Sequence, residues 1–211
     1  MTETTRTMDA GFLVRWLAAV SDDVDREADR LTELDSAIGD ADHGVNLKRG
    51  FTAVTEALAK EPPSTPGAVL IAAGRQLIST VGGASGPLYG TLLRRAGKAL
   101  GGDGEVTRAR LAEALDAGVA AVAQLGGARV GDKTMLDALV PAVVGLRSSF
   151  EAARAAAEGG ALATVPLRAR KGRASYLGER SIGHQDPGAT SSALLFAALA
   201  DVAYAGTGAG T

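Results

Sequence analysis

The chain contains no cysteine and only two histidines among its 211 residues. The absence of cysteine excludes disulfide bonds, cysteine-ligated zinc and thiol nucleophiles, and it agrees with a reducing compartment. Neither sign of charge dominates, because 22 lysines and arginines stand against 24 aspartates and glutamates. A net charge of −2 gives no basic footprint for nucleic acid or for an anionic membrane, so we expect neither as a partner.

Targeting segments and long apolar runs are missing as well. The first twenty residues carry no basic segment followed by an apolar run, which predicts that there is no signal peptide and that the protein stays in the cytoplasm. No apolar run reaches the ~18 residues that a membrane-spanning helix needs, because Arg75 interrupts one run and Asp201 bounds another. We therefore expect no membrane segment.

The period-two alternation that indicates strands is also absent, and apolar residues recur instead at intervals of three and four. This spacing predicts eight helices, at about residues 12–34, 45–60, 69–81, 87–100, 107–125, 135–144, 149–171 and from the turn at 186–188 to about 202. Short loops favour antiparallel neighbours, so the predicted fold is an all-α, up-and-down bundle or barrel. The seventh segment contains Gly159, Gly160 and Pro166 and is predicted to be kinked or split.

The length suits one domain with one core. We expect a single domain over residues 1–211, with residues 1–8 and 206–211 flexible.

The segment from Leu34 to Asn46 carries the clearest chemical signal, since it places Asp35, Asp40 and Asp42 among glycines. Carboxylates at ~6 Å would repel by roughly 3 kcal/mol per pair at an effective dielectric near 20, so such a cluster needs a cation. Three hard oxygen donors favour Mg²⁺ or Ca²⁺ over structural zinc, and the spacing does not match a Ca²⁺-binding loop. A capped, solvated turn is the alternative for this segment taken alone.

The glycine-rich polar loops precede every second predicted helix, at residues 34–46, 82–86, 126–134 and 183–188. In an alternating bundle these helices begin at the same end, so the four loops should meet there. Helix N-termini favour anions, and glycine lets the backbone approach a phosphate closely. The pattern predicts a phosphate receptor at one end of the bundle, although the loop at 82–86 alone is equally well a helix cap and turn.

Three features of these loops leave alternatives open. The segment Gly126–Thr134 looks like a Walker A loop, but Asp132 stands where that motif needs lysine and no strand precedes it, so we reject a P-loop. Arg173 suits a bidentate grip on phosphate, or a solvated face. His43 and His184 suit contacts with a phosphate or ribose, or structural hydrogen bonds in turns.

Four stretches together resemble the L subunit, the nucleotide-binding subunit, of dihydroxyacetone kinases. They are Asp35 with 38–46, GGASGPL at 82–88, GDKTM at 131–135 and the segment 171–191. The resemblance implies an eight-helix barrel that holds ADP or ATP as a bound coenzyme at one end. It implies Mg²⁺, expected as two ions, on Asp35, Asp40 and Asp42. The nucleotide contacts that it implies are His43, Gly44, Val45, Asn46, Ala84, Ser85, Gly126, Met135, Arg173, Asp186, Pro187 and Gly188.

The resemblance further implies a phosphotransferase that is active only with partner subunits and supplies no catalytic side chain of its own. In one branch of the family, a phosphohistidine carrier, the M subunit, rephosphorylates the bound ADP, and the ATP formed serves dihydroxyacetone on a K subunit. In the other branch, free ATP exchanges in and the sugar is a triose or tetrulose. The uninterrupted segment 178–188 and a free-standing chain resemble the first branch. A nucleotide-dependent module that binds a transcription regulator, and an inert helical scaffold, remain alternatives.

Overall fold

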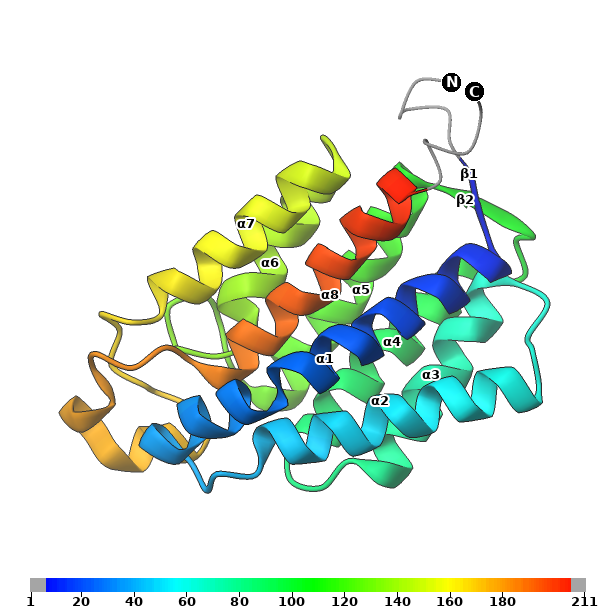
Figure 1. Cartoon of the computed structure of the whole chain (residues 1–211). Coiled ribbons are helices and arrows are strands. Elements are labelled where there is room, and N and C mark those ends of the chain that lie inside the picture. The colour runs from blue at the N-terminus through cyan, green and yellow to red at the C-terminus, as the bar shows by residue number, and fades with distance from the viewer. Residues whose placement is uncertain (1–6, 206–211) are drawn as a thin grey trace.

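The structure is a computed structural model that describes residues 7–205 (Figure 1). Its helices are α1 (Ala10–Ile38), α2 (His43–Lys60), α3 (Pro66–Thr80), α4 (Ser85–Leu100), α5 (Arg108–Gly126), α6 (Leu136–Leu146), α7 (Phe150–Ala163) and α8 (Pro187–Ala205). A 3₁₀ helix, η2 (Arg173–Ser181), lies in the α7–α8 connection, and two strands, β1 (Thr7–Asp9) and β2 (Glu105–Thr107), complete the described chain.

The eight α-helices form an up-and-down barrel, which confirms the predicted fold class. Each helix packs against the next in the sequence, and α8 packs against α1, which closes the ring (Figure 1). Large side chains such as Trp16, Phe51, Tyr89 and Phe196 fill the interior and are almost fully buried. Trp16 adds a buried hydrogen bond from its indole N–H to the Leu195 carbonyl, at 2.7 Å, which joins the first and last helices.

Capping residues explain where several helices begin. The side chains of Asp9, Thr65, Thr107 and Ser149 each accept a hydrogen bond from a backbone N–H in the first turn of the helix that follows. At the far end of α5, Gly127 adopts the left-handed conformation, with φ 55°, that commonly ends a helix. Local sequence therefore fixes these boundaries.

The predicted end of the first helix near Leu34 is wrong, because α1 continues for another turn to Ile38. Ile38 is buried in a small apolar cluster with Ala169 and Ala174, which come from the α7–α8 connection. This tertiary contact supports the extra turn. Asp35 consequently lies in the last turn of α1, where its position is defined by a helix.

The predicted continuation of the seventh helix to residue 171 is also wrong. The helix α7 passes Gly159 and Gly160 without a break and ends at Ala163, ahead of Pro166. Gly160 allows α6 and α7 to pack closely, because a Cβ there would lie under 3.0 Å from the carbonyl oxygen of Asp137. The remainder of the predicted helix, residues 164–171, is irregular chain, so the segment is split after α7 as one of the two expectations had it.

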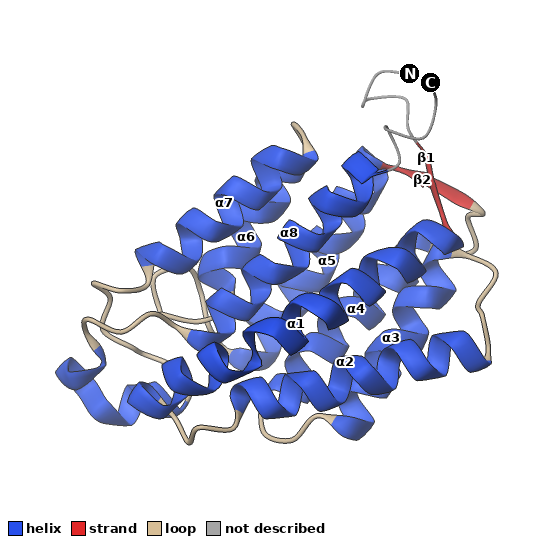
Figure 2. Cartoon of the chain, in the orientation of Figure 1, coloured by secondary structure: helices blue, strands red, loops and turns tan. Residues whose placement is uncertain are grey.

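A short two-stranded antiparallel sheet lies at the end of the barrel away from the four predicted site loops (Figure 2). Thr7 pairs with Thr107, and Met8 pairs with Val106. Three residues per strand are too few to produce a readable alternation, so the sheet was not predicted. Within the segment expected to be flexible, Thr7 and Met8 belong to this sheet, and Met8 is buried. Residues 1–6 and 206–211 lie outside the described chain.

The helix α8 has 19 residues and is long and apolar enough to cross a membrane by length and composition. About 61% of its apolar window is buried inside the protein, where it packs against α1, α6 and α7. Asp201 lies within this helix and does not end its apolar window, so the expectation that no apolar run reaches about 18 residues is wrong. The packing is that of a barrel core helix.

Candidate functional site

The connections α1–α2, α3–α4, α5–α6 and α7–α8 gather at one end of the barrel, at the lower left of Figure 1. They line a common cavity of about 410 Å³. Asp42 comes from the first connection, Ala84 from the second, Met135 from the third and Asp186 from the fourth. The convergence expected from the order of the glycine-rich loops is therefore present in the structure.

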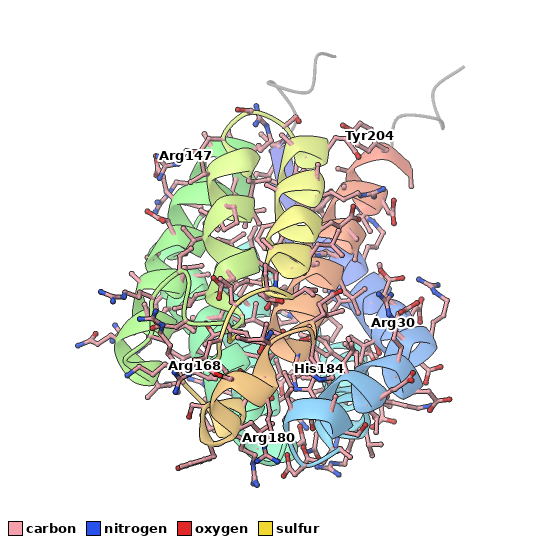
Figure 3. All side chains as sticks on the ribbon, turned by 90° about the vertical axis from the view of Figure 1, so that its left-hand side faces the viewer. Arg30, Arg147, Arg168, Arg180, His184 and Tyr204 are labelled. Atoms are coloured by element: carbon pink, nitrogen blue, oxygen red, sulfur yellow. The ribbon has the colours of Figure 1, made fainter. Side chains whose placement is uncertain are left out.

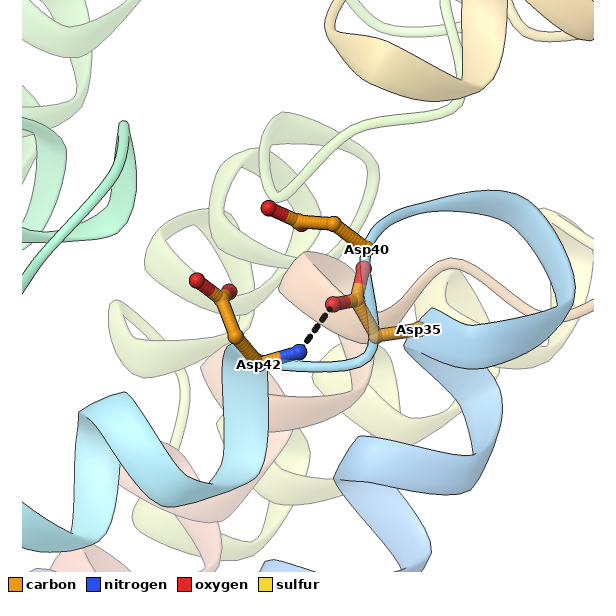
Figure 4. Close-up of side chains that lie close together, drawn as sticks. All are labelled: Asp35, Asp40 and Asp42. Atoms are coloured by element: carbon orange, nitrogen blue, oxygen red, sulfur yellow. Dashed lines mark hydrogen bonds between the residues drawn. The ribbon is translucent and has the colours of Figure 1, made fainter.

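Three carboxylates form a cluster at one side of this cavity (Figure 4). One oxygen from each of Asp35, Asp40 and Asp42 lies within 4.8 Å of the others; Asp35 is buried and the other two are exposed. Converging carboxylate oxygens fit a hard divalent cation such as Mg²⁺. The Arg173 guanidinium lies 3.0 Å from Asp40 and offsets part of the cluster's charge.

Asp35 is held in place from the last turn of α1. Its Oδ2 accepts a hydrogen bond from the Asp42 backbone N–H at 2.9 Å (Figure 4). It also accepts one from the His43 N–H at 3.2 Å, so it pairs with two free N–H groups at the N-terminus of α2. Gly39 makes room for this carboxylate, because a Cβ there would lie under 3.0 Å from Asp35 Oδ1. The turn between α1 and α2 therefore sets the spacing of the cluster.

His43 lies behind the carboxylates and is bonded at both ring nitrogens. Its Nε2 is 2.8 Å from the Ser191 hydroxyl, and its Nδ1 is 3.1 Å from the Ser85 hydroxyl. Burial lowers the pKa of His43, although the nearby Asp35 and Asp42 act to raise it. His43 thus links α2 to α4 and α8 as a buried polar group.

Tyr89 extends this network beneath the cavity. Its hydroxyl lies 2.7 Å from Ser191 Oγ and 3.0 Å from Ser192 Oγ, and donates to the Gly188 carbonyl at 3.3 Å. Burial raises the pKa of Tyr89 to about 12, so the phenol stays protonated. Tyr89, Ser191 and Ser192 were not predicted as site residues, because a tyrosine or serine inside an apolar helix resembles ordinary core.

Asp186 directly precedes α8 and is buried in the lining of the cavity. Its carboxylate accepts a hydrogen bond from the Ala189 backbone N–H at 2.7 Å, as an N-terminal cap does. Its own backbone N–H donates to Thr164 Oγ1 at 2.9 Å. Burial raises the pKa of Asp186 to about 7, and Lys133 nearby opposes that rise.

Lys133 is a further cavity residue that the sequence did not single out. Its side chain is almost fully buried, and its ammonium donates to the carbonyl oxygens of Thr164, at 2.7 Å, and His184. A lysine in a polar loop is ordinarily exposed, so no sequence signal indicated its burial. Lys133 belongs to the GDKTM stretch of the family resemblance, but the resemblance gave it no role.

The opposite side of the cavity is apolar. Its lining there comes from α4, α5, the α5–α6 connection and the start of α6, and consists of Leu88, Val122, Leu125, Ala128 and Leu136. The cavity therefore has a side that suits a metal-bound anion and a side that suits a flat apolar group.

Comparison with known proteins decides the family. The DAK2 domain family matches residues 37–201. The chain belongs to the DAK2 domain family.

Relatives of this DAK2 domain include the "PEP-dependent dihydroxyacetone kinase, ADP-binding subunit DhaL" of Escherichia coli strain K12. It is 46% identical over 198 residues, which cover 89% of this chain and 94% of the relative. The D-erythrulose kinase of Mycolicibacterium smegmatis is 37% identical over 204 residues, 91% of this chain but 35% of that kinase. The crystal structure of the dihydroxyacetone kinase from C. freundii in complex with AMP-PNP and Mg²⁺ superposes with a TM-score of 0.70 and 30% identity. That match covers 91% of this chain, which spans about a third (33%) of the C. freundii chain.

Most of the predicted site residues line the cavity of this DAK2 domain. They are the three aspartates with His43, Ala84, Ser85, Gly126, Met135, Arg173, Asp186, Pro187 and Gly188. Their contacts with a nucleotide or metal remain predictions.

Three predicted nucleotide contacts, Gly44, Val45 and Asn46, do not line the cavity. Gly44 packs against α1, because a Cβ there would lie under 3.0 Å from the Ala28 carbonyl oxygen. Val45 is exposed, and Asn46 accepts a hydrogen bond from Arg49 at 2.7 Å. These positions fit helix packing and the outer rim, and their contact with a nucleotide stays a prediction.

Proposed function

We propose that this chain is the nucleotide-binding subunit of a dihydroxyacetone kinase that depends on the phosphoenolpyruvate phosphotransferase system. ADP with Mg²⁺ is its bound coenzyme, a phosphohistidine carrier M subunit is the phosphoryl donor, and dihydroxyacetone on a K subunit is the acceptor. The observation that carries the proposal is the cavity with a carboxylate cluster on one side and an apolar wall on the other. The names of relatives that match nearly end to end support the same reaction.

The phosphate side of the cavity suits a diphosphate. Asp35, Asp40 and Asp42 would hold Mg²⁺, expected as two ions, and the metal would neutralise phosphate charge during transfer. Arg173 is exposed and pairs with Asp40 beside the cluster, where its guanidinium would also reach a bound phosphate. The N-terminus of α8 contributes a positive dipole end at the same cavity.

The apolar side suits the base of the nucleotide. Leu88, Val122 and Leu125 present aliphatic surface there, and Met135 adds a polarizable thioether that packs well on aromatic rings. Ala128 and Gly126 keep this wall shallow enough to admit a flat ring. We propose that adenine lies on this wall and the phosphates lie toward the aspartates.

No side chain of this chain needs to carry the phosphoryl group. His43 is buried, and the hydroxyls of Ser85 and Ser191 occupy both of its ring nitrogens, so it is poorly placed as a phosphohistidine. In-line phosphoryl transfer depends mainly on positioning and electrostatic stabilisation, which the carboxylates, the helix ends and Arg173 would supply. The chain would thus act as the holder of the coenzyme.

The partner subunits would dock at the cavity end of the barrel. Most of the large apolar side chains exposed in the described chain lie in or beside the four connections: Val45, Ile78, Leu125, Val130, Leu162, Tyr176 and Ile182. Figure 3 shows Arg168, Arg180 and His184 at this end, away from Arg147 and Tyr204. Exposed apolar residues rimmed by charges are typical of protein interaction surfaces. We propose that the K and M subunits use this surface in the cytoplasm.

A reconstituted transfer assay tests the proposal. The purified chain is dialysed, mixed with phosphorylated carrier and a K subunit with dihydroxyacetone, and the phosphorylated sugar is measured. We expect retained ADP to be phosphorylated and the sugar to accept the group. Asp42→Asn should abolish transfer without unfolding the barrel, whereas the control Asp29→Asn, an exposed position on α1, should not. Normal transfer by Asp42→Asn would contradict the proposal.

Exchange with free ATP is the second candidate function, favoured by the similarity to D-erythrulose kinase. Rapid loss of nucleotide on dialysis and phosphorylation of a triose or tetrulose with external ATP would support it. ADP binding without any transfer to the sugar would support instead a module that binds a transcription regulator.

A further inference from the structure

Lys133 is a buried cation in the wall of the cavity. Its side chain is 1% exposed, and its backbone adopts the left-handed conformation with φ 63°, which a lysine seldom does. Burying an ammonium is costly unless its N–H groups are bonded and a counter-charge lies near. The surroundings of Lys133 supply both, which indicates a defined role for this side chain.

The ammonium joins three segments that are far apart in the sequence. It extends from the α5–α6 loop and donates to the carbonyl oxygens of Thr164 and His184. Thr164 follows directly after α7, and His184 lies shortly before α8, so the two acceptors mark the two ends of the α7–α8 connection. One residue before Lys133, a backbone hydrogen bond from the Arg170 N–H to the Asp132 carbonyl, at 3.0 Å, joins the same two connections.

The loop that carries Lys133 is itself fixed to α6. Asp137 accepts hydrogen bonds from the backbone N–H groups of Gly131, at 2.6 Å, and Thr134, at 2.7 Å. Met135 follows in the cavity wall, and a Cβ on Gly188 at the start of α8 would lie 3.5 Å from the Met135 backbone nitrogen. The contacts of Lys133 therefore lie next to the point where Met135, of the α5–α6 loop, approaches Gly188, at the start of α8.

The charges around Lys133 match this arrangement. Burial lowers the pKa of Lys133, while Asp186 and Asp137 act to raise it. In return, Lys133 opposes the rise in the pKa of Asp186 that burial causes. Loss of the Lys133 ammonium would remove a hydrogen-bond donor from the carbonyl oxygens of Thr164 and His184 and a cation that acts on the buried Asp186.

We propose that Lys133 is a positioning residue of the nucleotide site. Its ammonium ties the α5–α6 loop to both ends of the α7–α8 connection, and so holds Met135 and Gly188 at the spacing that the nucleotide requires. The proposal rests on the proposed ADP-binding function. It assigns Lys133 no contact with the nucleotide and no part in the chemical step.

The test compares Lys133→Met, which removes the donors and the charge, with Lys98→Met on the exposed face of α4. ADP affinity is measured by calorimetry with Mg²⁺, and Mn²⁺ affinity without nucleotide. We expect Lys133→Met to weaken ADP binding at least tenfold and to leave Mn²⁺ binding within twofold, because the aspartates lie on another connection. Lys98→Met should match the wild type in both. A general loss of structure would weaken both ligands.

Amide hydrogen exchange on the nucleotide-free protein provides a second measurement. We expect Lys133→Met to speed exchange at residues 128–135 and 183–189 and not in α1 to α3. Lys133→Gln, which keeps two N–H donors, replaces Lys133→Met if the latter does not fold, with an expected ADP affinity at least threefold below wild type. ADP binding by the variant equal to that of wild type would overturn the inference and leave the proposed function standing. A wild-type chain that fails to bind ADP would overturn both.

Discussion

The three carboxylates of the cluster differ in how firmly they are held. Asp35 is buried and bonded to the N-terminus of α2, whereas Asp40 and Asp42 are exposed, and Asp40 pairs with Arg173. A buried, hydrogen-bonded carboxylate beside two exposed ones gives a cation one firmly positioned ligand. The geometry of the α1–α2 turn should therefore control metal affinity as strongly as the carboxylates themselves.

Substitution of Gly39 tests whether the α1–α2 turn determines metal affinity. A Cβ at residue 39 would lie under 3.0 Å from Asp35 Oδ1, so Gly39→Ala must displace that carboxylate. We expect Mg²⁺-dependent ADP affinity, measured by calorimetry, to fall at least tenfold with no loss of helix content by circular dichroism. Gly102→Ala is the matched control, because a Cβ there meets nothing within 4 Å. Equal affinity of the Gly39→Ala and wild-type proteins would show that the turn does not position Asp35.

The buried Asp186 should make stability depend on pH. Burial raises its pKa from 3.8 to about 7, with Asp137 and Asp35 adding to the rise and the Ala189 N–H and Lys133 opposing it. The native state therefore favours the protonated form. The contribution of Asp186 to the free energy of unfolding is therefore largest at acid pH. It falls by up to roughly 4 kcal/mol as pH rises from about 4 to about 7.

Asp186→Asn isolates this contribution, because asparagine still accepts from the Ala189 N–H but does not ionise. Urea unfolding without divalent cations, repeated across this pH range, gives the free energy of each protein. We expect the wild type to lose stability relative to Asp186→Asn as pH rises, and the difference to level off above about pH 7. A difference that stays constant with pH would mean that Asp186 titrates normally.

At the scale of elements, adjacent glycines in α7 have opposite roles. A Cβ on Gly160 would lie under 3.0 Å from the Asp137 carbonyl oxygen of α6, whereas one on Gly159 meets nothing within 4 Å. We expect Gly160→Ala to lower the free energy of unfolding by about 1–3 kcal/mol through overpacking. Gly159→Ala should raise it by up to about 1 kcal/mol through helix propensity. Chemical denaturation measures both, and equal effects would contradict the close α6–α7 contact.

Local signals predicted the helices that depend on local causes. The apolar spacing placed the starts of the fifth and seventh helices near residues 107 and 149, and in the structure Thr107 and Ser149 cap α5 and α7. Where tertiary contacts decide, the prediction failed. The burial of Ile38 against Ala169 and Ala174 extends α1, and the pairing of β1 with β2 joins segments about a hundred residues apart.

The same distinction holds for the candidate site. Aspartates and glycines in polar loops are visible in the sequence, so the carboxylate cluster and most of the cavity lining were predicted. Lys133, Tyr89 and Ser191 were missed, because each acts through partners from other connections or helices. A lysine that bonds two distant carbonyls cannot be told from an exposed lysine by its neighbours in the chain.

At the scale of the whole molecule, the closed ring of alternating helices explains why one site draws on four separate loops. Even-numbered helices all begin at the same end, and the contact of α8 with α1 completes the circle around the cavity (Figure 1). The central claim is that this end binds a magnesium–nucleotide complex.

Calorimetric titration of the metal-free protein with ADP, with and without Mg²⁺, tests that claim most directly. We expect one ADP per chain, tight binding only in the presence of Mg²⁺, and loss of this binding in Asp40→Asn and Asp42→Asn while both variants keep their fold. No heat of ADP binding to the wild type, or binding that is the same without Mg²⁺ and in both variants, would contradict it.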